Sequence, residues 1–319
     1  MSNYEVDVSI VIPSYNMEKF IAQSIKSAIE QDYDSFEVIV CDNCSTDSTY
    51  KIAKSIVSGK LKVLTNDSNI GATGNFNRLI SEAKGEYIKF LEADDMLEKK
   101  CLKKMVSYFN DPSINLATSS SFIIDENDNQ IGVLSNKKTQ IQAGITVVKN
   151  IRTKGNEIGT PSDVMVRSTI FGRAGVFDMY YDPYLNDWDL WIRICRVSNI
   201  MFVADKLAKV RRHVGQIGVT GAASNQDIVA VLKMVDRNFK SIDRLKNLVH
   251  FSSEYILRAT KRLVKFRNKE AVKYLFNTLH VIRDRVNFSI LFLGFIYCVV
   301  FLPYLKYKAK KNQTKQKGG

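Results

Sequence analysis

Apolar positions in the first hundred residues form short continuous runs that alternate with segments of helical spacing. The runs predict buried strands at residues 8–12, 36–41, 61–64 and 87–91. Between them, apolar residues recur every three or four positions, which predicts helices at 17–31, 45–57 and 74–83. This alternation is typical of an α/β fold with a mostly parallel sheet flanked by helices.

Polar motifs follow each predicted strand. They are Pro13-Ser14-Tyr15-Asn16, the stretch 42–47 (DNCSTD), the stretch 69–74 (NIGATG), and Glu92-Ala93-Asp94-Asp95. In an open α/β sheet, ligands bind at the carboxyl ends of the strands. The four loops are therefore predicted to converge on one rim.

Three acids, Glu92, Asp94 and Asp95, come directly after the strand at 87–91. Mg²⁺ and Mn²⁺ prefer oxygen ligands and take one or two carboxylates together with water and substrate phosphate. The acids therefore indicate a metal site for diphosphate chemistry. The same residues also fit a loop in which Asp95 is the N-cap of a following helix.

The loop after the second strand suggests nucleoside binding. Asp42 can accept a hydrogen bond from the ring N–H of a pyrimidine, while Ser45 or Asp47 caps the next helix. Ordinary turn and cap residues would look the same. Neither a G-x-G-x-x-G after the first strand nor a G-x-x-x-x-G-K-[ST] motif is present, which argues against a dinucleotide enzyme and a P-loop NTPase.

Two further polar residues lie in the second half of the apparent catalytic region. Asp187 falls at the first turn of a predicted helix whose core face is Leu190, Ile194 and Trp191, so it either caps the helix or projects into a cleft. His213 follows a strand-like stretch at 207–210 and is either structural or a ligand.

Charge divides the chain of 319 residues, which is 45% hydrophobic and 25% charged, into two parts. Residues 231–319 hold 20 Lys/Arg against 5 Asp/Glu, a net +15, whereas residues 1–230 hold 26 against 28, a net −2. This predicts one large domain with a basic appendage. Such an appendage suits either nucleic acid or an anionic membrane face.

The apolar content of the appendage favours a membrane over nucleic acid. Residues 286–305 carry no charge and as a helix would measure about 30 Å, the hydrocarbon thickness of a bilayer. Upstream, basic and apolar residues interleave over 256–275, as in a basic amphipathic helix on an anionic membrane surface. The segment 286–305 could span, re-enter or lie on the membrane, or form a buried helix or oligomer contact.

The N-terminus has no basic n-region or apolar h-region, so no secretory signal is predicted and the catalytic part is expected in the cytosol. The expected location is the cytoplasmic face of the cell membrane. Five dispersed cysteines suggest reduced thiols rather than a disulfide framework. Cys41 and Cys44 have C-x-x-C spacing, but a redox or zinc role would need a second pair.

Taken in order, these motifs resemble the family 2 glycosyltransferases, which are inverting enzymes of the GT-A fold. The matching segments span about residues 8–215 and also include 186–191 (NDWDLW) and 211–213 (RRH). Two positions depart from the family pattern. Glu92 stands where the pattern has its first aspartate, and Asn186 stands where an acidic residue usually precedes the base.

The resemblance implies a role for each site residue. Asp94 would contact the ribose, Asp95 would bind Mn²⁺ or Mg²⁺ at the diphosphate, Asp187 would be the general base, and His213 would be a further metal or diphosphate contact. Arg211 would lie near the leaving group. The nucleoside would be held by Pro13, Ser14, Tyr15 and Asp42.

The predicted function is metal-dependent, inverting transfer from a nucleotide-sugar, with a UDP-sugar expected, to a glycan or lipid-linked acceptor in bacterial surface polysaccharide synthesis. The predicted domains are a GT-A catalytic domain at 1–225, with its nucleotide-sugar half at 1–110 and its acceptor half at 111–225, and a basic helical membrane-associating tail at 226–319. A polyprenyl-phosphate sugar synthase and a non-catalytic nucleotide-sugar-binding scaffold are the alternatives. Nucleic acid is not an expected partner, and an oligomer stays open.

Overall fold

The computed structural model describes residues 4–135, 138–154, 156–181 and 185–213. The predicted tail at 226–319, its apolar segment at 286–305 and the last residues of the predicted catalytic domain lie outside these described residues. Within the described ranges, none of the helices combines the length and apolar content needed to cross a membrane.

The first hundred residues form the predicted alternation of strands and helices. Its elements are β1 (Val6–Ser14), α1 (Ile21–Ile29), β2 (Phe36–Asp42), α2 (Thr49–Ser55), β3 (Leu61–Thr65), α3 (Gly71–Glu82) and β4 (Gly85–Phe90). Helices α1 and α2 begin about four residues later than predicted, because polar side chains hold both entry loops in turns. The Thr49 hydroxyl accepts the Met17 N–H at 2.7 Å, and the Asp47 carboxylate accepts the Thr49 N–H at 2.9 Å.

The remaining elements contain more short strands than the apolar pattern shows. They are β5 (Met96–Leu97), α4 (Cys101–Val106), η1 (Ser107–Asn110), β6 (Ile114–Ile124), β7 (Gln130–Leu134), β8 (Gln140–Gln142), α5 (Gly144–Lys154), η2 (Pro161–Asp163), β9 (Val164–Arg167), η3 (Ser168–Ile170), α6 (Phe171–Ala174), η4 (Met179–Tyr181), α7 (Asn186–Cys195) and β10 (Asn199–Arg211).

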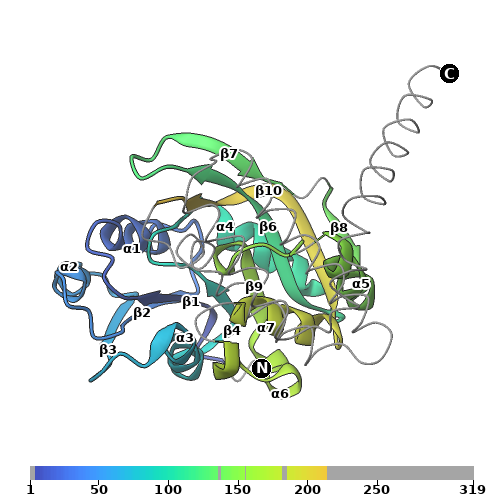
Figure 1. Ribbon diagram of the computed structural model, residues 1–319, viewed down its shortest axis with the longest axis horizontal. Coiled ribbons are helices and arrows are strands. Elements are labelled where there is room, and N and C mark those ends of the chain that lie inside the picture. The colour runs from blue at the N-terminus through green and yellow to red at the C-terminus, as the bar shows by residue number, and fades with distance from the viewer. Residues whose placement is uncertain (1–3, 136–137, 155, 182–184, 214–319) are drawn as a thin grey trace, which may run out of the picture. The chain divides into compact units, whose positions relative to one another are not determined.

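The strands form one mixed, mostly parallel sheet with the order β3-β2-β1-β4-β9-β6-β10-β5 (Figure 1). The pairs β2/β3, β1/β2, β1/β4 and β6/β10 are parallel. Strand β9 is antiparallel to both β4 and β6 and joins the two parallel groups. The predicted α/β architecture, a largely parallel sheet flanked by helices, is confirmed.

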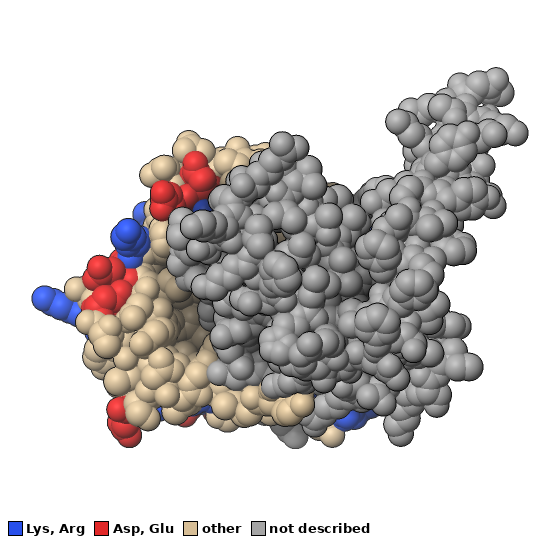
Figure 2. Space-filling model, viewed as in Figure 1, with Lys and Arg blue, Asp and Glu red and all other residues tan. Residues whose placement is uncertain are grey.

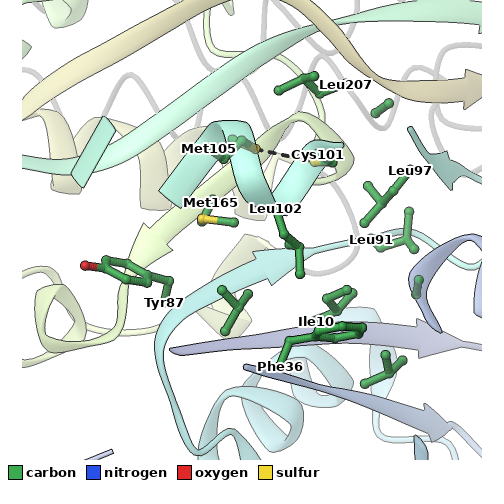
Figure 3. Close-up of a cluster of buried hydrophobic side chains, with 14 of the residues drawn as sticks. Ile10, Phe36, Tyr87, Leu91, Leu97, Cys101, Leu102, Met105, Met165 and Leu207 are labelled. Atoms are coloured by element: carbon green, nitrogen blue, oxygen red, sulfur yellow. Dashed lines mark hydrogen bonds between the residues drawn. The ribbon is translucent and has the colours of Figure 1, made fainter. Parts of the chain in front are cut away.

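One face of the sheet carries an aliphatic core. Ile10 and Phe36 pack with Leu91 and with Leu102 and Met105 of α4 (Figure 3). All five are at most 4% exposed. Because β1 and β4 pack tightly against this core, the loops at their carboxyl ends are held in fixed positions.

Aromatic side chains fill the other face. Phe90 of β4 meets Phe76 of α3 edge-on at 5.9 Å between ring centroids and lies 5.8 Å from Trp191 of α7. Phe177 stacks on Phe76 at 4.8 Å. Trp191 is fully buried, as are Leu190 and Ile194, which confirms the predicted core face of this helix. The aromatic cluster packs α3 and α7 against the same strand.

Charges of both signs lie close together on the described surface visible in Figure 2. Exposed ion pairs include Lys84 with Glu5 and Lys62 with Glu82, both at 2.7 Å. Cysteines 41, 44, 101 and 195 are free thiols, so the C-x-x-C pair forms no disulfide.

Candidate active site

The predicted nucleoside residues meet at the ends of β1 and β2. Ser14 and Asp42 are paired in the parallel ladder and are only 3% and 1% exposed. Asp42 accepts hydrogen bonds from the Ser45 N–H at 2.9 Å and the Ser45 hydroxyl at 2.5 Å. Pro13 is half-buried and Tyr15 is exposed, so these two side chains present the accessible surface of this part of the rim.

A network of buried asparagines, which the sequence did not reveal, supports this loop. The Asn43 side-chain oxygen accepts hydrogen bonds from the Asn66 amide at 2.7 Å and from the Ile70 N–H at 3.0 Å. Its amide nitrogen donates to Asn69 at 2.8 Å and to the Gly71 carbonyl at 3.1 Å. The loop after β3 is thereby fixed beside Asp42.

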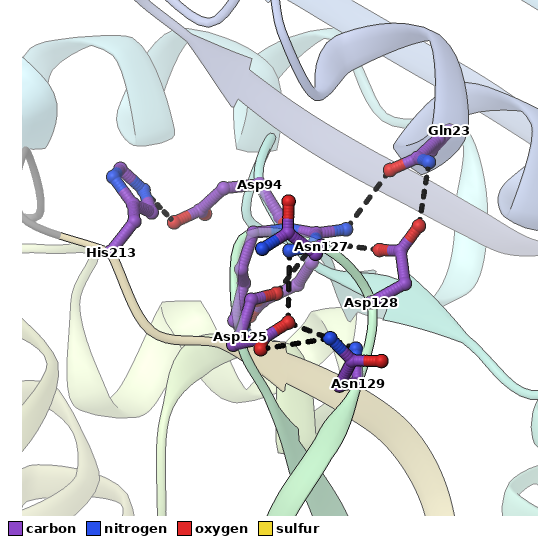
Figure 4. Close-up of polar contacts among 9 residues, drawn as sticks. Gln23, Asp94, Asp125, Asn127, Asp128, Asn129 and His213 are labelled. Carbon is purple, nitrogen blue, oxygen red and sulfur yellow. Dashed lines mark hydrogen bonds and ion pairs between the residues drawn. The ribbon is translucent and has the colours of Figure 1, made fainter.

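The acids after β4 lie against the carboxyl end of β10. The Arg211 backbone N–H donates to Asp95 Oδ1 at 2.8 Å, and the Arg211 side-chain Nε donates to the Asp94 carbonyl at 2.8 Å. His213 Nε2 lies 3.0 Å from Asp94 Oδ2 (Figure 4). The structure therefore brings together four residues that were predicted from separate motifs.

The Arg211 guanidinium is fully buried and binds the turn between β6 and β7. It donates to the Asp125 carbonyl at 3.0 Å, pairs with Asp128 Oδ1 at 2.6 Å and donates to Gln23 of α1 at 3.0 Å. The Phe20 ring lies 4.6 Å from the guanidinium carbon. Arg211 thus connects three separate segments, and its predicted contact with a leaving group stays a prediction.

Glu92 adds a carboxylate to the same region. Its backbone N–H donates to the Ser162 hydroxyl at 2.9 Å, and its carbonyl accepts the Ser24 hydroxyl at 3.2 Å. Burial raises the pKa of Glu92, and the neighbouring carboxylates of Asp95, Asp94 and Asp187 raise this pKa further. The longer glutamate therefore lies in one acidic region with Asp94, Asp95 and the predicted base, Asp187.

A buried lysine lies beneath this acidic rim. Lys89 of β4 is fully buried, and its ammonium donates to the carbonyls of Phe90 at 3.1 Å, Val164 at 3.3 Å and Ser162. Burial lowers its pKa, which the negative charges of Asp163 and Asp95 partly restore. Burial likewise raises the pKa of Asp163 to about 6.

One carboxylate oxygen of the rim suits a cation. Asp95 Oδ2 is buried and accepts no hydrogen bond from the described residues. Burial and the charge of Asp94 raise the pKa of Asp95. The described residues contain no cluster of three His, Cys, Asp or Glu side chains with metal-binding geometry. A cation that takes one or two carboxylates and completes its shell with water and phosphate fits this arrangement.

The alternative of Asp95 as a helix N-cap is wrong. The chain after Asp95 pairs with β10 as β5, at Met96–Leu97, and the next helix, α4, begins only at Cys101. Extended backbone therefore follows the acids directly, because Leu97 is needed in the core.

Asp187 lies in the first turn of α7, after Leu185 at the N-cap. Its carboxylate accepts the Trp188 N–H at 2.8 Å. Burial raises its pKa to about 6. Asp187 as a residue is partly exposed. A carboxyl group with this pKa is ionised at neutral pH yet basic enough to take a proton, as general-base catalysis requires.

The mixed sheet, the acids after β4 and the carboxylate on α7 define a GT-A-like enzyme of sugar transfer. The model of the family described as "Glycosyl transferase family 2" matches residues 9–173, and the chain belongs to this family of inverting, nucleotide-sugar-dependent glycosyltransferases.

Known proteins support this assignment. The chain is 30% identical over 195 residues to the UDP-Glc:alpha-D-GlcNAc-diphosphoundecaprenol beta-1,3-glucosyltransferase WfgD of Escherichia coli, covering 60% of this chain and 71% of that one. It shares its fold with S. aureus TarS 1-349 in complex with UDP-GlcNAc, with a TM-score of 0.65, 18% identity and coverage of 89% and 82%. The mannosyltransferase PcManGT of Pyrobaculum calidifontis, with GDP-Man and Mn²⁺, gives a TM-score of 0.54 at 15% identity, covering 94% and 89%.

Proposed function

We propose that this chain transfers a sugar from a UDP-sugar to a lipid-linked saccharide acceptor, with inversion at the anomeric carbon and with Asp187 as the general base. The observation that carries the proposal is the Asp187 carboxyl group, with a pKa near 6, in the same acidic region as Glu92, Asp94 and Asp95. The named activity of WfgD, which uses UDP-Glc and a diphosphoundecaprenol acceptor, supports the substrate classes.

The proposed reaction is a single displacement. Asp187 takes the proton of the acceptor hydroxyl as its oxygen attacks the anomeric carbon, and the bond from that carbon to the UDP oxygen breaks. Base catalysis of this kind typically contributes about 10²–10⁴-fold to the rate. Attack opposite to the leaving group converts an α-linked donor into a β-linked product.

Asp95, with His213 as a further contact, would hold Mn²⁺ or Mg²⁺, while Asp94 would contact the ribose. The buried free oxygen of Asp95 and the oxygen preference of these ions support this assignment. When bound, the ion supplies Lewis-acid neutralisation of the charge on the diphosphate. The Mn²⁺ in the PcManGT structure makes manganese the first ion to test.

The binding experiment is isothermal titration of UDP with and without Mn²⁺. We expect Mn²⁺-dependent binding that is lost in Asp95→Ala and retained in Asp111→Ala, which removes a partly exposed carboxylate that accepts the Ser113 N–H at 2.8 Å. Binding that survives Asp95→Ala would overturn the metal assignment. Product analysis then separates the activities: transfer to a lipid phosphate would indicate a polyprenyl-phosphate sugar synthase, and UDP binding without any transfer would indicate a scaffold.

We also propose that the chain works at the cytoplasmic face of the cell membrane. The uncharged stretch at 286–305 and the basic stretch upstream support this location. Deleting residues 281–319 should move the protein from the membrane fraction to the supernatant. An unchanged membrane fraction would refute the role of the tail.

A further inference from the structure

Helix α3 is bonded to both halves of the described structure. On the donor side, the Asn75 amide donates to the Cys41 carbonyl of β2 at 2.8 Å. On the other side, the Asn77 carboxamide exchanges two hydrogen bonds with the Phe177 backbone, at 2.8 and 3.0 Å. These bonds come from short side chains on a packed helix. Helix α3 therefore holds β2 at a fixed distance from the segment around Phe177.

A third bond leads from α3 to the proposed base. The Asn186 amide donates to the Thr73 hydroxyl at 2.8 Å, and the two residues are 7% and 0% exposed. The Asn186 side-chain oxygen accepts the backbone N–H of Asp187, also at 2.8 Å. One carboxamide therefore joins α3 to the residue that carries the base.

We propose that Asn186 is a positioning residue that, through Thr73, sets the place of Asp187 relative to the bound donor. The proposal rests on the proposed sugar transfer. Asp42 ends β2 and Asn43 follows it, and Asn75 of α3 is bonded to β2. The proposed nucleoside site and the proposed base are therefore both held by α3. Displacement of a catalytic group by about 1 Å can cost about 10²-fold in rate.

An amide is the side chain that this place requires. The Asn186 carboxamide donates through its nitrogen and accepts through its oxygen at the same time. An ionised carboxylate could only accept, and it would place a negative charge next to the carboxyl group of Asp187. The asparagine therefore makes both bonds without adding charge to the acidic region.

The test compares Thr73→Val with Thr118→Val in the full-length chain. Both changes keep the side-chain shape and remove the hydroxyl of a fully buried threonine, but the Thr118 hydroxyl donates to the Ile158 carbonyl, whereas the Thr73 hydroxyl accepts the Asn186 amide. We expect Thr73→Val to lower kcat about 10-fold or more, with the donor KM changed less than about 2-fold. Thr118→Val should show a similar loss of thermal stability with kcat nearly unchanged.

Two further variants separate positioning from general stability. Thr73→Ser keeps the hydroxyl and should retain kcat. Asn186→Ala should lower kcat, and adding Thr73→Val to it should lower kcat no further, because both changes remove the same bond. Equal kcat values for Thr73→Val and Thr118→Val, or additive losses in the double variant, would overturn the proposal.

A readout that needs no turnover distinguishes this proposal from the proposed function. Hydrogen exchange of peptides covering 186–190 should be faster in Thr73→Val than in the wild type and unchanged in Thr118→Val. If the wild type transfers no sugar, the proposed function fails, and unchanged exchange in Thr73→Val then overturns the positioning role as well.

Discussion

Replacing Asp187 by asparagine tests the assignment of the base most directly. The change keeps the size of the side chain and an oxygen that can accept the Trp188 N–H, as the carboxylate does at 2.8 Å. It removes the group that accepts the proton. We therefore expect kcat to fall by about 10²–10⁴-fold, the usual contribution of general-base catalysis.

The pH dependence follows from the pKa of about 6 that burial gives Asp187. The ionised carboxylate is the active form, so it makes up about 90% of the enzyme at pH 7 and about 10% at pH 5. The wild-type kcat/KM should consequently fall about 10-fold between these pH values. The stability of the fold changes with pH in the opposite sense to kcat/KM. The folded state binds the Asp187 proton more tightly than the unfolded chain does, so the free energy of unfolding falls as the pH rises through 6. Asp187→Asn should therefore not lower stability at pH 7.

The assay is initial-rate transfer from a UDP-sugar at saturating Mn²⁺ between pH 5 and 8. Asp189→Asn is the matched control, since Asp189 lies on the same helix but pairs with Arg193 at 2.7 Å. The control should keep the acidic limb of the profile, and Asp187→Asn should lose it. If Asp187→Asn retained more than about a tenth of the wild-type kcat, or kept the same limb, another group would be the base.

Two further changes probe the support of the rim. Lys89→Met should lower the free energy of unfolding by about 3–5 kcal/mol in urea, because it removes the ammonium that donates to three buried carbonyls and that balances the charge of Asp163. A loss below about 1 kcal/mol would show that Met is accommodated there. Arg211→Lys keeps the charge but not the fork that reaches Asp94 and Asp128. Hydrogen exchange at 125–129 should therefore become faster, and unchanged exchange would mean that the turn is held in another way.

Much of the donor half could be predicted from its sequence. Strands β1, β2 and β4 are mostly apolar because both of their faces are covered, with the buried Lys89 as an exception in β4, and the rim motifs stand at their carboxyl ends. The strands and the rim motifs depend on local patterns, which the sequence displays directly. The grouping of the acids with His213 was implied only by the family resemblance.

Other features depend on contacts between residues distant in sequence. Strand β9 is four residues long and takes its place only by pairing with β4 and β6. Asn66 and Asn75 look like turn and surface residues, and only the folded chain shows them bonded 3.1 Å apart in the interior. The place of Arg211 near the leaving group stays a prediction, and the sequence alone could not show that its guanidinium bonds to Asp125, Asp128 and Gln23. The recurrence of asparagine at positions 66, 69, 75 and 77 was the feature of the sequence that could have indicated the buried network.

The insertion of β9 between β4 and β6 affects how the chain can fold as it is synthesised. Strand β4 pairs with β1 on one side and, on its other edge, with β9, where Tyr87 lies opposite Arg167, 80 positions later. Until β9 leaves the ribosome, residues 1–110 have an open, apolar strand edge at β4, of the kind that promotes aggregation. A fragment ending near residue 110 should therefore be insoluble, and the donor half cannot be moved into a chimaera unless β9 comes with it.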